Sequence, residues 1–150
     1  MKNVVADTAL NGLLYMKGTW ETKAFTSEYA FEQCFDEGIA QVSSVNLIAP
    51  ILLVKSWLPS LRKSSNPKVI LMGALSGLDN FPVREVANLA SKFGLRGVVH
   101  ALREELRDDR IAVTVTNPGN IATPEVLSDL REAGESEDNA TPLSESTEHY

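Results

Sequence analysis

The apolar and polar positions of the chain predict three strands and two long helices. The strand segments are short and either continuously apolar or β-branched, which is typical of strands in a parallel sheet. The helical segments are longer, with apolar residues every three or four positions. The predicted strands lie within residues 4–14, 68–72 and 111–116, and the predicted helices span residues 29–61 and 83–107. This order predicts an α/β fold: a three-layer parallel sheet of βαβαβ type with two long helices and right-handed crossovers.

The first predicted helix is apolar nearly all round between Val45 and Leu58. Such a helix buries two faces, so one face covers the sheet and the other needs a second partner. Its helical pattern loosens around Gly38 and around residues 46–50. The second predicted helix carries regularly spaced small residues that permit close approach of another backbone: Ala87, Ala90, Gly94, Gly97 and Ala101.

The formal net charge of -6 is concentrated towards the C-terminus. Residues 134–150 contain five acidic side chains and no Lys or Arg, so the rest of the chain is close to neutral. No basic face for a nucleic acid or a membrane surface is present. We therefore expect one domain over residues 1–131 and an acidic, disordered tail over residues 132–150.

The cysteine count and the apolar runs indicate the compartment. Cys34 is the single cysteine, so the chain cannot form an internal disulfide, which fits a reducing environment. No secretory signal is evident, and the longest apolar run, residues 47–54, is far shorter than the ~20 residues of a membrane span. No Cys/His cluster has metal-ligand spacing. We expect a cytoplasmic protein with no metal, no nucleic-acid partner and no membrane partner.

Four segments within residues 40–127 carry motifs. Residues 45–50 read Val-Asn-Leu-Ile-Ala-Pro, and residues 69–77 read Val-Ile-Leu-Met-Gly-Ala-Leu-Ser-Gly. Residues 88–97 read Asn-Leu-Ala-Ser-Lys-Phe-Gly-Leu-Arg-Gly, and residues 113–124 read Val-Thr-Val-Thr-Asn-Pro-Gly-Asn-Ile-Ala-Thr-Pro. In this order they resemble helix 4, strand 5, the Tyr-x-x-x-Lys helix and strand 6 of the short-chain dehydrogenase/reductase family.

The resemblance implies a partial Rossmann-like fold, the C-terminal half of the family's domain, and NAD(P)-dependent oxidoreduction. It places Asn46 at the Asn that holds a proton-relay water, and Lys92 at the catalytic lysine. The Asn-Asn-Ala-Gly turn of the family corresponds at best to residues 9–12. The cofactor contacts that the resemblance implies are Asn11, Lys92, Pro118, Gly119 and Thr123.

The departures from the family pattern affect the chemistry directly. Asn88 stands at the catalytic Tyr position, and Ala74 stands at the Ser position (Leu75 if the loop has one extra residue). An amide cannot donate the proton that the family's tyrosine exchanges with substrate. The Gly-x-x-x-Gly-x-Gly loop, which holds the cofactor diphosphate in the family, is also missing. We therefore expect a truncated relative that is inactive alone.

The site residues that follow the family pattern also have structural interpretations. Thr123 suits the N-cap of a short helix beginning at Pro124 or just after it. Pro118 and Gly119 suit a turn that ends a strand. Lys92 suits a solvated helix position, and Asn46 suits a helix irregularity.

Four functions stay open at this stage. The first is an inactive family relative that retains the family's dimerisation helices. The second is an oligomerisation module without a cofactor, forming a homodimer or a complex with a full-length relative through the two long helices. The third is a residual NAD(P)-dependent alcohol or carbonyl oxidoreductase. The fourth is a fragment with no stable fold.

Overall fold

The computed structural model of the protein describes residues 8–79, 83–119, 121–132, 134 and 136–140. The chain divides into two compact units between Asn117 and Pro118. The sequence placed the division further along, at residue 131, where the acidic tail begins. The first unit holds the sheet and the long helices, and the second unit holds one shorter helix.

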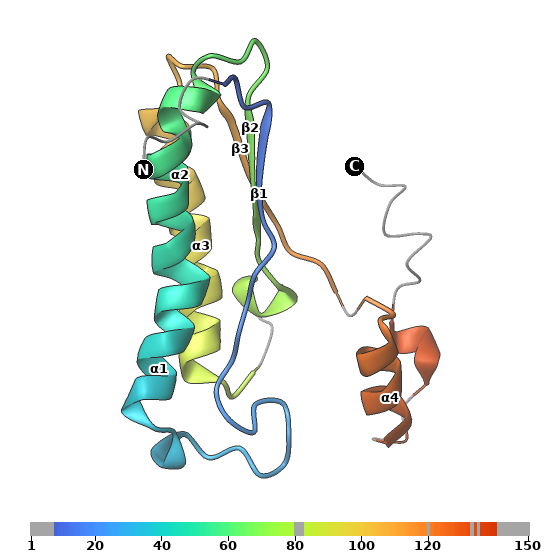
Figure 1. Ribbon diagram of the computed structural model, residues 1–150. Helices are drawn as coiled ribbons and strands as arrows, with labels where there is room; N and C mark the ends of the chain where they lie inside the picture. The colour runs from blue at the N-terminus through green and yellow to red at the C-terminus, as the bar shows by residue number, and fades with distance from the viewer. Residues whose placement is uncertain (1–7, 80–82, 120, 133, 135, 141–150) are drawn as a thin grey trace. The chain divides into compact units, whose positions relative to one another are not determined.

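The first unit is built on a sheet of three parallel strands, as the sequence predicted (Figure 1). The strands, in their order across the sheet, are β1, Gly12–Tyr15, β2, Lys68–Met72, and β3, Ala112–Thr116. β2 and β3 match their predicted ranges within one residue. β1 begins later than expected within residues 4–14, and Asp7 lies outside the described residues.

The connection from β1 to β2 contains one continuous helical segment that starts later than predicted. Its parts are α1, Asp36–Ser43, a π-helical segment, Ser44–Ile48, and α2, Ala49–Leu61. A separate 3-10 turn, Phe31–Gln33, precedes it. Pro50 has no N–H to donate to the carbonyl of Asn46, so the helix cannot keep its regular bonding there. The Ala49 N–H bonds to the Ser44 oxygen, five residues back, where a regular α-helix would use the residue four back. The irregularity expected around residues 46–50 is this π-helical turn.

The helix over Asp36–Leu61 has 26 residues and is long and apolar enough, by length and composition only, to cross a membrane. Only 22% of its apolar window is buried inside the structure. Its inner side packs on the sheet through Val54 and Leu61, both of which are buried. Its outer side exposes Ile48 and Leu52. Within the described residues, the second face that the sequence predicted to be buried has no partner.

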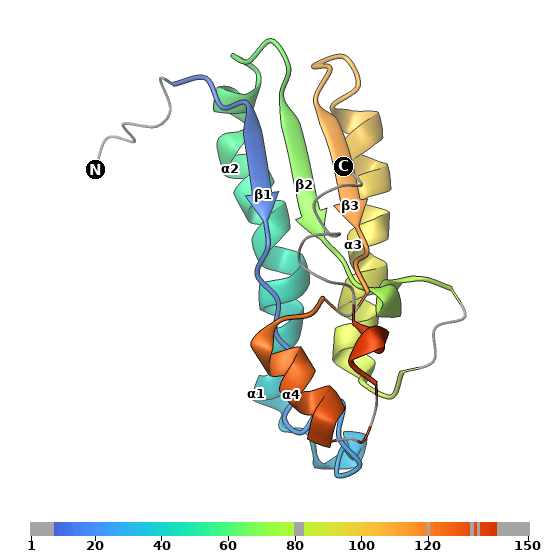
Figure 2. The ribbon, with the colours of Figure 1, turned by 90° about the vertical axis from the view of Figure 1, so that its right-hand side faces the viewer.

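The connection from β2 to β3 contains a 3-10 turn, Leu75–Gly77, and α3, Val86–Glu105. The views in Figures 1 and 2 place α2 and α3 on the same face of the sheet. Right-handed crossovers put both helices on one face when the strand order does not reverse. Over residues 8–117, so far as they are described, the other face carries no helix, so two of the three expected layers are seen here.

The core lies between the sheet and these two helices. Alternate strand residues point to the helices, because successive side chains of a strand face opposite ways. Thus Leu13 packs against the core, whereas the side chain of its neighbour Leu14 is on the other face and 58% exposed. The buried core residues are Val54, Leu61, Val69, Leu71, Leu95, Val99, Leu106, Ile111 and Val113.

The second unit contains α4, Pro124–Glu132, and a 3-10 turn, Glu137–Asn139. Arg131 bonds through Nε to Oε1 of Glu137 at 2.6 Å, which links the helix to this turn. Residues 136–140, within the predicted acidic tail, therefore have defined positions relative to α4. The sequence also predicted disorder for residues 133, 135 and 141–150, which lie outside the described residues.

Candidate functional site

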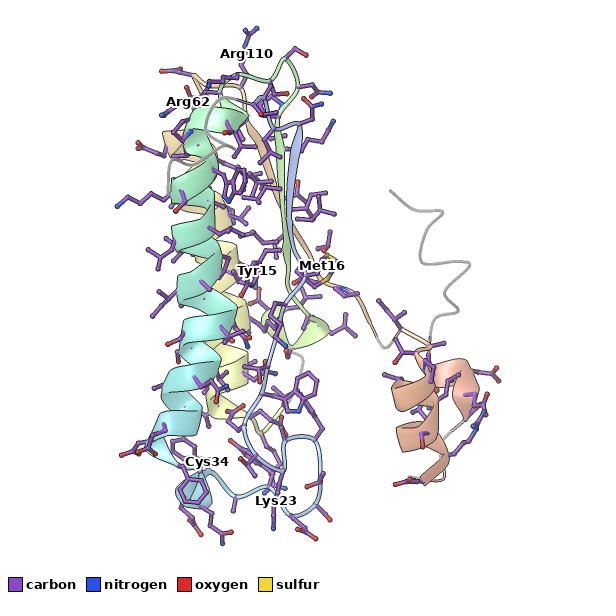
Figure 3. The ribbon with its side chains drawn as sticks, viewed as in Figure 1. Tyr15, Met16, Lys23, Cys34, Arg62 and Arg110 are labelled. Atoms are coloured by element: carbon purple, nitrogen blue, oxygen red, sulfur yellow. The ribbon has the colours of Figure 1, made fainter. Side chains whose placement is uncertain are left out.

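The carboxyl ends of parallel strands are where α/β folds place their ligand sites. In this protein, that edge is followed by the turn after β1, residues 16–19, and by the loop after β2, residues 73–77. Figure 3 shows Tyr15 directed towards the helices and Met16 directed to the other side of the chain. The Tyr15 hydroxyl donates to the carbonyl of Val45 at 2.6 Å, at the start of the π-helical turn.

Asn46 lies on the π-helical turn and is 1% exposed. Its Oδ1 accepts from the Thr19 N–H at 2.9 Å, and its Nδ2 donates to the Thr19 carbonyl at 2.8 Å. The same Nδ2 donates to Ser91 Oγ at 3.0 Å. The Asn46 amide therefore ties the turn after β1 to α3, in the region where Lys92 lies.

Asn88, which the sequence resemblance aligns with the family's tyrosine, is buried. Its Oδ1 lies 3.5 Å from Nδ2 of Asn46. Ser91, the hydroxyl residue of this cluster, donates to the Asn88 carbonyl at 2.7 Å while accepting from Asn46. The cluster thus consists of neutral amides and a hydroxyl whose bonds are already made within the protein.

Lys92 is 8% exposed, one helical turn after Asn88. Its Nζ donates to the Met72 carbonyl, at the end of β2, at 3.2 Å. Burial lowers the pKa of Lys92 below its usual value, because the charged ammonium is separated from water. Lys92 and Asn46 both lie near Gly18, so the structure brings them to one cluster. The interpretation of Lys92 as a solvated residue does not hold.

Gly18 borders this cluster from the turn after β1. A Cβ placed on it would lie 3.5 Å from Nζ of Lys92 and 3.8 Å from Oδ1 of Asn46. Both distances are ordinary van der Waals contacts, so a methyl group at Gly18 would contact the amine and the amide without overlap. Sequence analysis missed Gly18, although a glycine soon after an apolar strand segment was a usable signal.

The N-terminus of α3 is closed by residues from the loop after β1. Glu21 is 2% exposed, and its Oε1 accepts from the N–H groups of Ala87 at 2.6 Å and Asn88 at 3.2 Å. The Tyr29 hydroxyl accepts from the Val86 N–H at 3.2 Å. A carboxylate suits this place because the first N–H groups of a helix have no intrahelical partner and the helix dipole favours negative charge there. No local sequence signal pairs Glu21 with a helix more than 60 residues away.

Ala74, which the sequence resemblance aligns with the family's serine, directly follows Gly73. Its N–H donates to Oδ1 of Asn117 at 3.2 Å, and its methyl group has no proton to exchange. Ser76, two residues later, is buried in the 3-10 turn Leu75–Gly77. That turn packs closely on α3, since a Cβ on Gly77 would lie 3.1 Å from the Lys92 carbonyl oxygen.

Asn11 is a correction to the expected cofactor site. It precedes β1, at the amino edge of the sheet, where its carbonyl accepts from the Lys68 N–H at 3.0 Å and its Oδ1 accepts from Ser64 Oγ at 2.6 Å. The turn that follows the strand, residues 16–19, begins five residues further along. Asn11 therefore lies at the opposite edge from Lys92, because the motif was assigned to the wrong end of the strand.

Three further expected cofactor contacts lie in the second unit: Pro118, Gly119 and Thr123. Thr123 caps α4, since its Oγ1 accepts from the Val126 N–H at 3.3 Å and its carbonyl accepts from the Leu127 N–H at 3.0 Å. The helix-cap interpretation of Thr123 is thus what the structure shows. Pro118 and Gly119 follow β3 after Asn117 and belong to no helix or strand.

The parallel sheet and the two helices on one of its faces define a Rossmann-like α/β protein. The family model of the short chain dehydrogenases matches residues 10–133. The chain belongs to this family.

The chain is similar to several curated members of the family. It is 32% identical to dehydrogenase/reductase SDR family member 7B of Rattus norvegicus over 83 residues, 55% of this chain and 25% of the relative. It is 28% identical to 3-ketodihydrosphingosine reductase of Bacteroides thetaiotaomicron over 94 residues, 63% of this chain and 35% of that relative. The chain thus spans about a quarter to a third of the length of these relatives.

Solved structures confirm the fold. An NADPH-bound carbonyl reductase from chicken fatty liver has a TM-score of 0.74 at 18% identity. The match covers 95% of this chain and 56% of that one. A short chain dehydrogenase from Shigella flexneri has a TM-score of 0.69 at 21% identity, covering 87% of this chain and 50% of that one. The chain therefore corresponds to about half of each of these proteins.

Proposed function

We propose that this chain is a family member that does not catalyse hydride transfer alone and that associates with a second subunit through its long helices. The observation that carries the first part is the buried amide of Asn88 at the tyrosine position. Reduction of a carbonyl needs a group that delivers a proton to the developing alkoxide. Neither Asn88 nor Ala74 has such a proton, and the Ser91 hydroxyl is already bonded to Asn88 and Asn46.

The two described tyrosines also support this proposal. Tyr15 donates its proton to the Val45 carbonyl, and Tyr29 lies at the N-terminus of α3 against Val86. Burial raises the pKa of both hydroxyls, which disfavours the phenolate. Neither hydroxyl is therefore placed to act as the proton donor in the way the family's tyrosine does.

The residues of the first unit do not fit the diphosphate of NAD(P). Dinucleotide sites in α/β folds use the free N-terminus of a helix to bind phosphate. The first turn of α1 carries Asp36 and Glu37, which repel an anion. The first N–H groups of α3 are occupied by Glu21 and Tyr29. We infer that Lys92 retains its place in the family pattern without a diphosphate site beside it in this unit.

Restoring the lost side chains should not restore activity. We expect the double variant Asn88→Tyr/Ala74→Ser, like the parent, to show no saturable binding of NADPH in the micromolar range and no reduction of simple ketones. The reason is that the substitutions supply a proton donor but no diphosphate site. Fluorescence titration and NADPH consumption measure the two effects separately. Saturable binding together with turnover by the parent chain would favour the residual oxidoreductase instead.

The outer side of the long helices supports the second part of the proposal. Ile48, Ile51 and Leu52 lie at helical spacing on one side and are 48%, 39% and 55% exposed. On α3, Val86 and Phe93 are 46% and 38% exposed. The family resemblance implies that these helices pair with the same helices of a second subunit. A homodimer or a complex with a full-length relative would cover these apolar side chains.

Leu52→Glu should weaken this association at least about tenfold, because it places a charge in an apolar contact. The matched control is Leu14→Glu, since Leu14 is equally exposed at 58% but lies on the sheet. Light scattering at tens of micromolar should show a dimer for the parent and for Leu14→Glu, and a monomer for Leu52→Glu. A monomeric parent would contradict the homodimer, and equal effects of both variants would contradict the assigned surface.

A further inference from the structure

The segment of residues 19–25, which follows the turn after β1, is attached to the start of α3 by polar bonds. In its middle, Oε1 of Glu21 accepts from two N–H groups in the first turn of α3. At its end, the Phe25 N–H donates at 2.8 Å to Oε1 of Glu85, the residue that precedes α3. Both attachments therefore depend on a carboxylate. We refer to residues 19–25 as the strap.

The backbone of the strap is strained at two positions. Lys23 and Phe25 have φ angles of 60° and 63°, in the left-handed region that residues with a Cβ atom disfavour. A bulky residue such as phenylalanine is rare there. Strain of this kind persists only where surrounding contacts hold the backbone, and it is common in segments that switch between conformations. Detachment of the strap from α3 would release it.

The attachment of Glu21 to α3 is incomplete. Its Oε1 accepts two hydrogen bonds, but its Oε2 is buried and accepts none from the described residues. A buried polar atom without a hydrogen bond costs free energy, and more so when the group is charged. Detachment of the strap would return this oxygen to water, so the closed position carries a second cost besides the backbone strain.

The strap covers little apolar surface. Trp20 and Phe25 form an edge-to-face pair with ring centroids 5.8 Å apart, yet each side chain is 59% exposed. The buried side chains of the strap are those of Glu21 and Ala24. Segments with few buried apolar contacts open at a lower free energy than the core does. The hydrogen bonds to α3, rather than apolar burial, therefore hold the strap in place.

The strap also borders the cluster around Lys92. Thr19, its first residue, makes both backbone bonds to the Asn46 amide, at 2.9 and 2.8 Å. Glu21 accepts from the Asn88 N–H. Gly18, directly before the strap, lies against the amine of Lys92. Detachment would free the Asn46 amide and admit water to this side of the cluster.

We propose that the strap is a gate: it detaches from α3 as one unit, while the rest of the first unit stays folded, and the open form exposes the cluster of Asn46, Asn88 and Lys92. Its attachments break together because they lie within seven residues of one another. The closed form predominates because several hydrogen bonds, two of them to a buried carboxylate, outweigh the strain. The gate concerns access to the cluster, so it does not depend on whether the chain catalyses or binds anything there.

The test is native-state hydrogen exchange of the full chain, followed by NMR at urea concentrations below the unfolding transition. Four N–H groups report the attachments, and we expect their protection factors to agree within about threefold. They should be at least about tenfold lower than those of Leu95 and Val99, which are buried in the core. Urea should leave them nearly unchanged, because a local opening exposes little surface. These N–H groups are those of Thr19, Phe25, Ala87 and Asn88.

A variant that removes strain from the closed strap gives the second readout. Lys23→Gly permits φ of 60° without strain, so it should raise the protection of the four N–H groups at least about twofold. It also removes the pair with Glu28, which is exposed on both sides and contributes little. The matched control is Arg110→Gly, at φ of 55° outside the strap, which should leave these groups unchanged.

Three results would overturn the gate. The first is protection of the four N–H groups as high as that of Leu95 and Val99, which would mean that they open only when the whole unit unfolds. The second is equal effects of Lys23→Gly and Arg110→Gly on these groups, which has the same meaning. The third is low protection at the start of α3 together with high protection at Thr19 and Phe25, which would mean that the helix end frays beneath a closed strap.

Discussion

Gly73→Ala should lower the free energy of unfolding by about 3 kcal/mol, because it forces atoms into a filled site and breaks a hydrogen bond. An added Cβ would overlap Oδ1 of Asn117 and would lie 2.9 Å from the Thr116 carbonyl oxygen. That carbonyl also accepts from the Gly73 N–H at 2.7 Å, so the backbone cannot move away freely. Displacing Asn117 would also remove its bond to the Ala74 N–H. Urea denaturation followed by circular dichroism measures the loss.

Gly97→Ala is the matched control for this change. Gly97 lies inside α3, and a Cβ there would meet nothing within 4 Å. Alanine is favoured over glycine in a helix, so this variant should gain about 0.5–1 kcal/mol. If Gly73→Ala were as stable as the parent, the close approach of β2 and β3 at their carboxyl ends would be wrong.

Glu21→Ala should also cost about 3 kcal/mol in the free energy of unfolding. The substitution leaves the N–H groups of Ala87 and Asn88 without their acceptor in a buried place, and hydrogen bonds to charged groups are the stronger ones. The favourable interaction of the carboxylate with the helix dipole is lost as well. Urea denaturation gives the total effect, and amide hydrogen exchange at Ala87 and Asn88 should show the local loss of protection.

Two controls identify the cause of the Glu21 effect. Glu21→Gln keeps an acceptor oxygen but removes the charge, so its cost should be smaller, about 1 kcal/mol. Glu28→Ala removes an acid from the same loop. Its pair with Lys23, at 2.7 Å, is exposed on both sides, so this variant should leave stability almost unchanged. Equal costs for Glu21→Ala and Glu28→Ala would show that Glu21 does not cap α3.

These two predictions concern the framework that holds the Asn46–Lys92 cluster. Gly73 lies at the end of β2, next to the Met72 carbonyl that accepts from Lys92. Glu21 fixes the start of α3 through the N–H groups of Ala87 and Asn88, and Asn88 lies one turn before Lys92. A loss of stability in either variant should therefore be accompanied by a changed environment of Lys92, which hydrogen exchange at its backbone N–H can report.

The sequence alone determined the order of strands and helices, the family, and the position of Asn88 one helical turn before Lys92. All of these depend on neighbours within a few residues. Apolar runs and helical spacing mark the elements, and Asn88 and Lys92 share a helix face because they are four residues apart. Even the π-helical turn was visible as an irregularity before Pro50.

Only the tertiary structure decided which groups meet at the site. Glu21 bonds to Ala87, which is 66 residues away along the chain. Asn46 bonds to Ser91, which is 45 residues away. Nothing in the local sequence specifies such contacts, because they depend on how the crossovers place each loop against the sheet edge. Asn11 was assigned to the site because a motif does not show at which end of a strand it lies. The ends of β1, which separate Asn11 from Gly18, became known only from its pairing with β2.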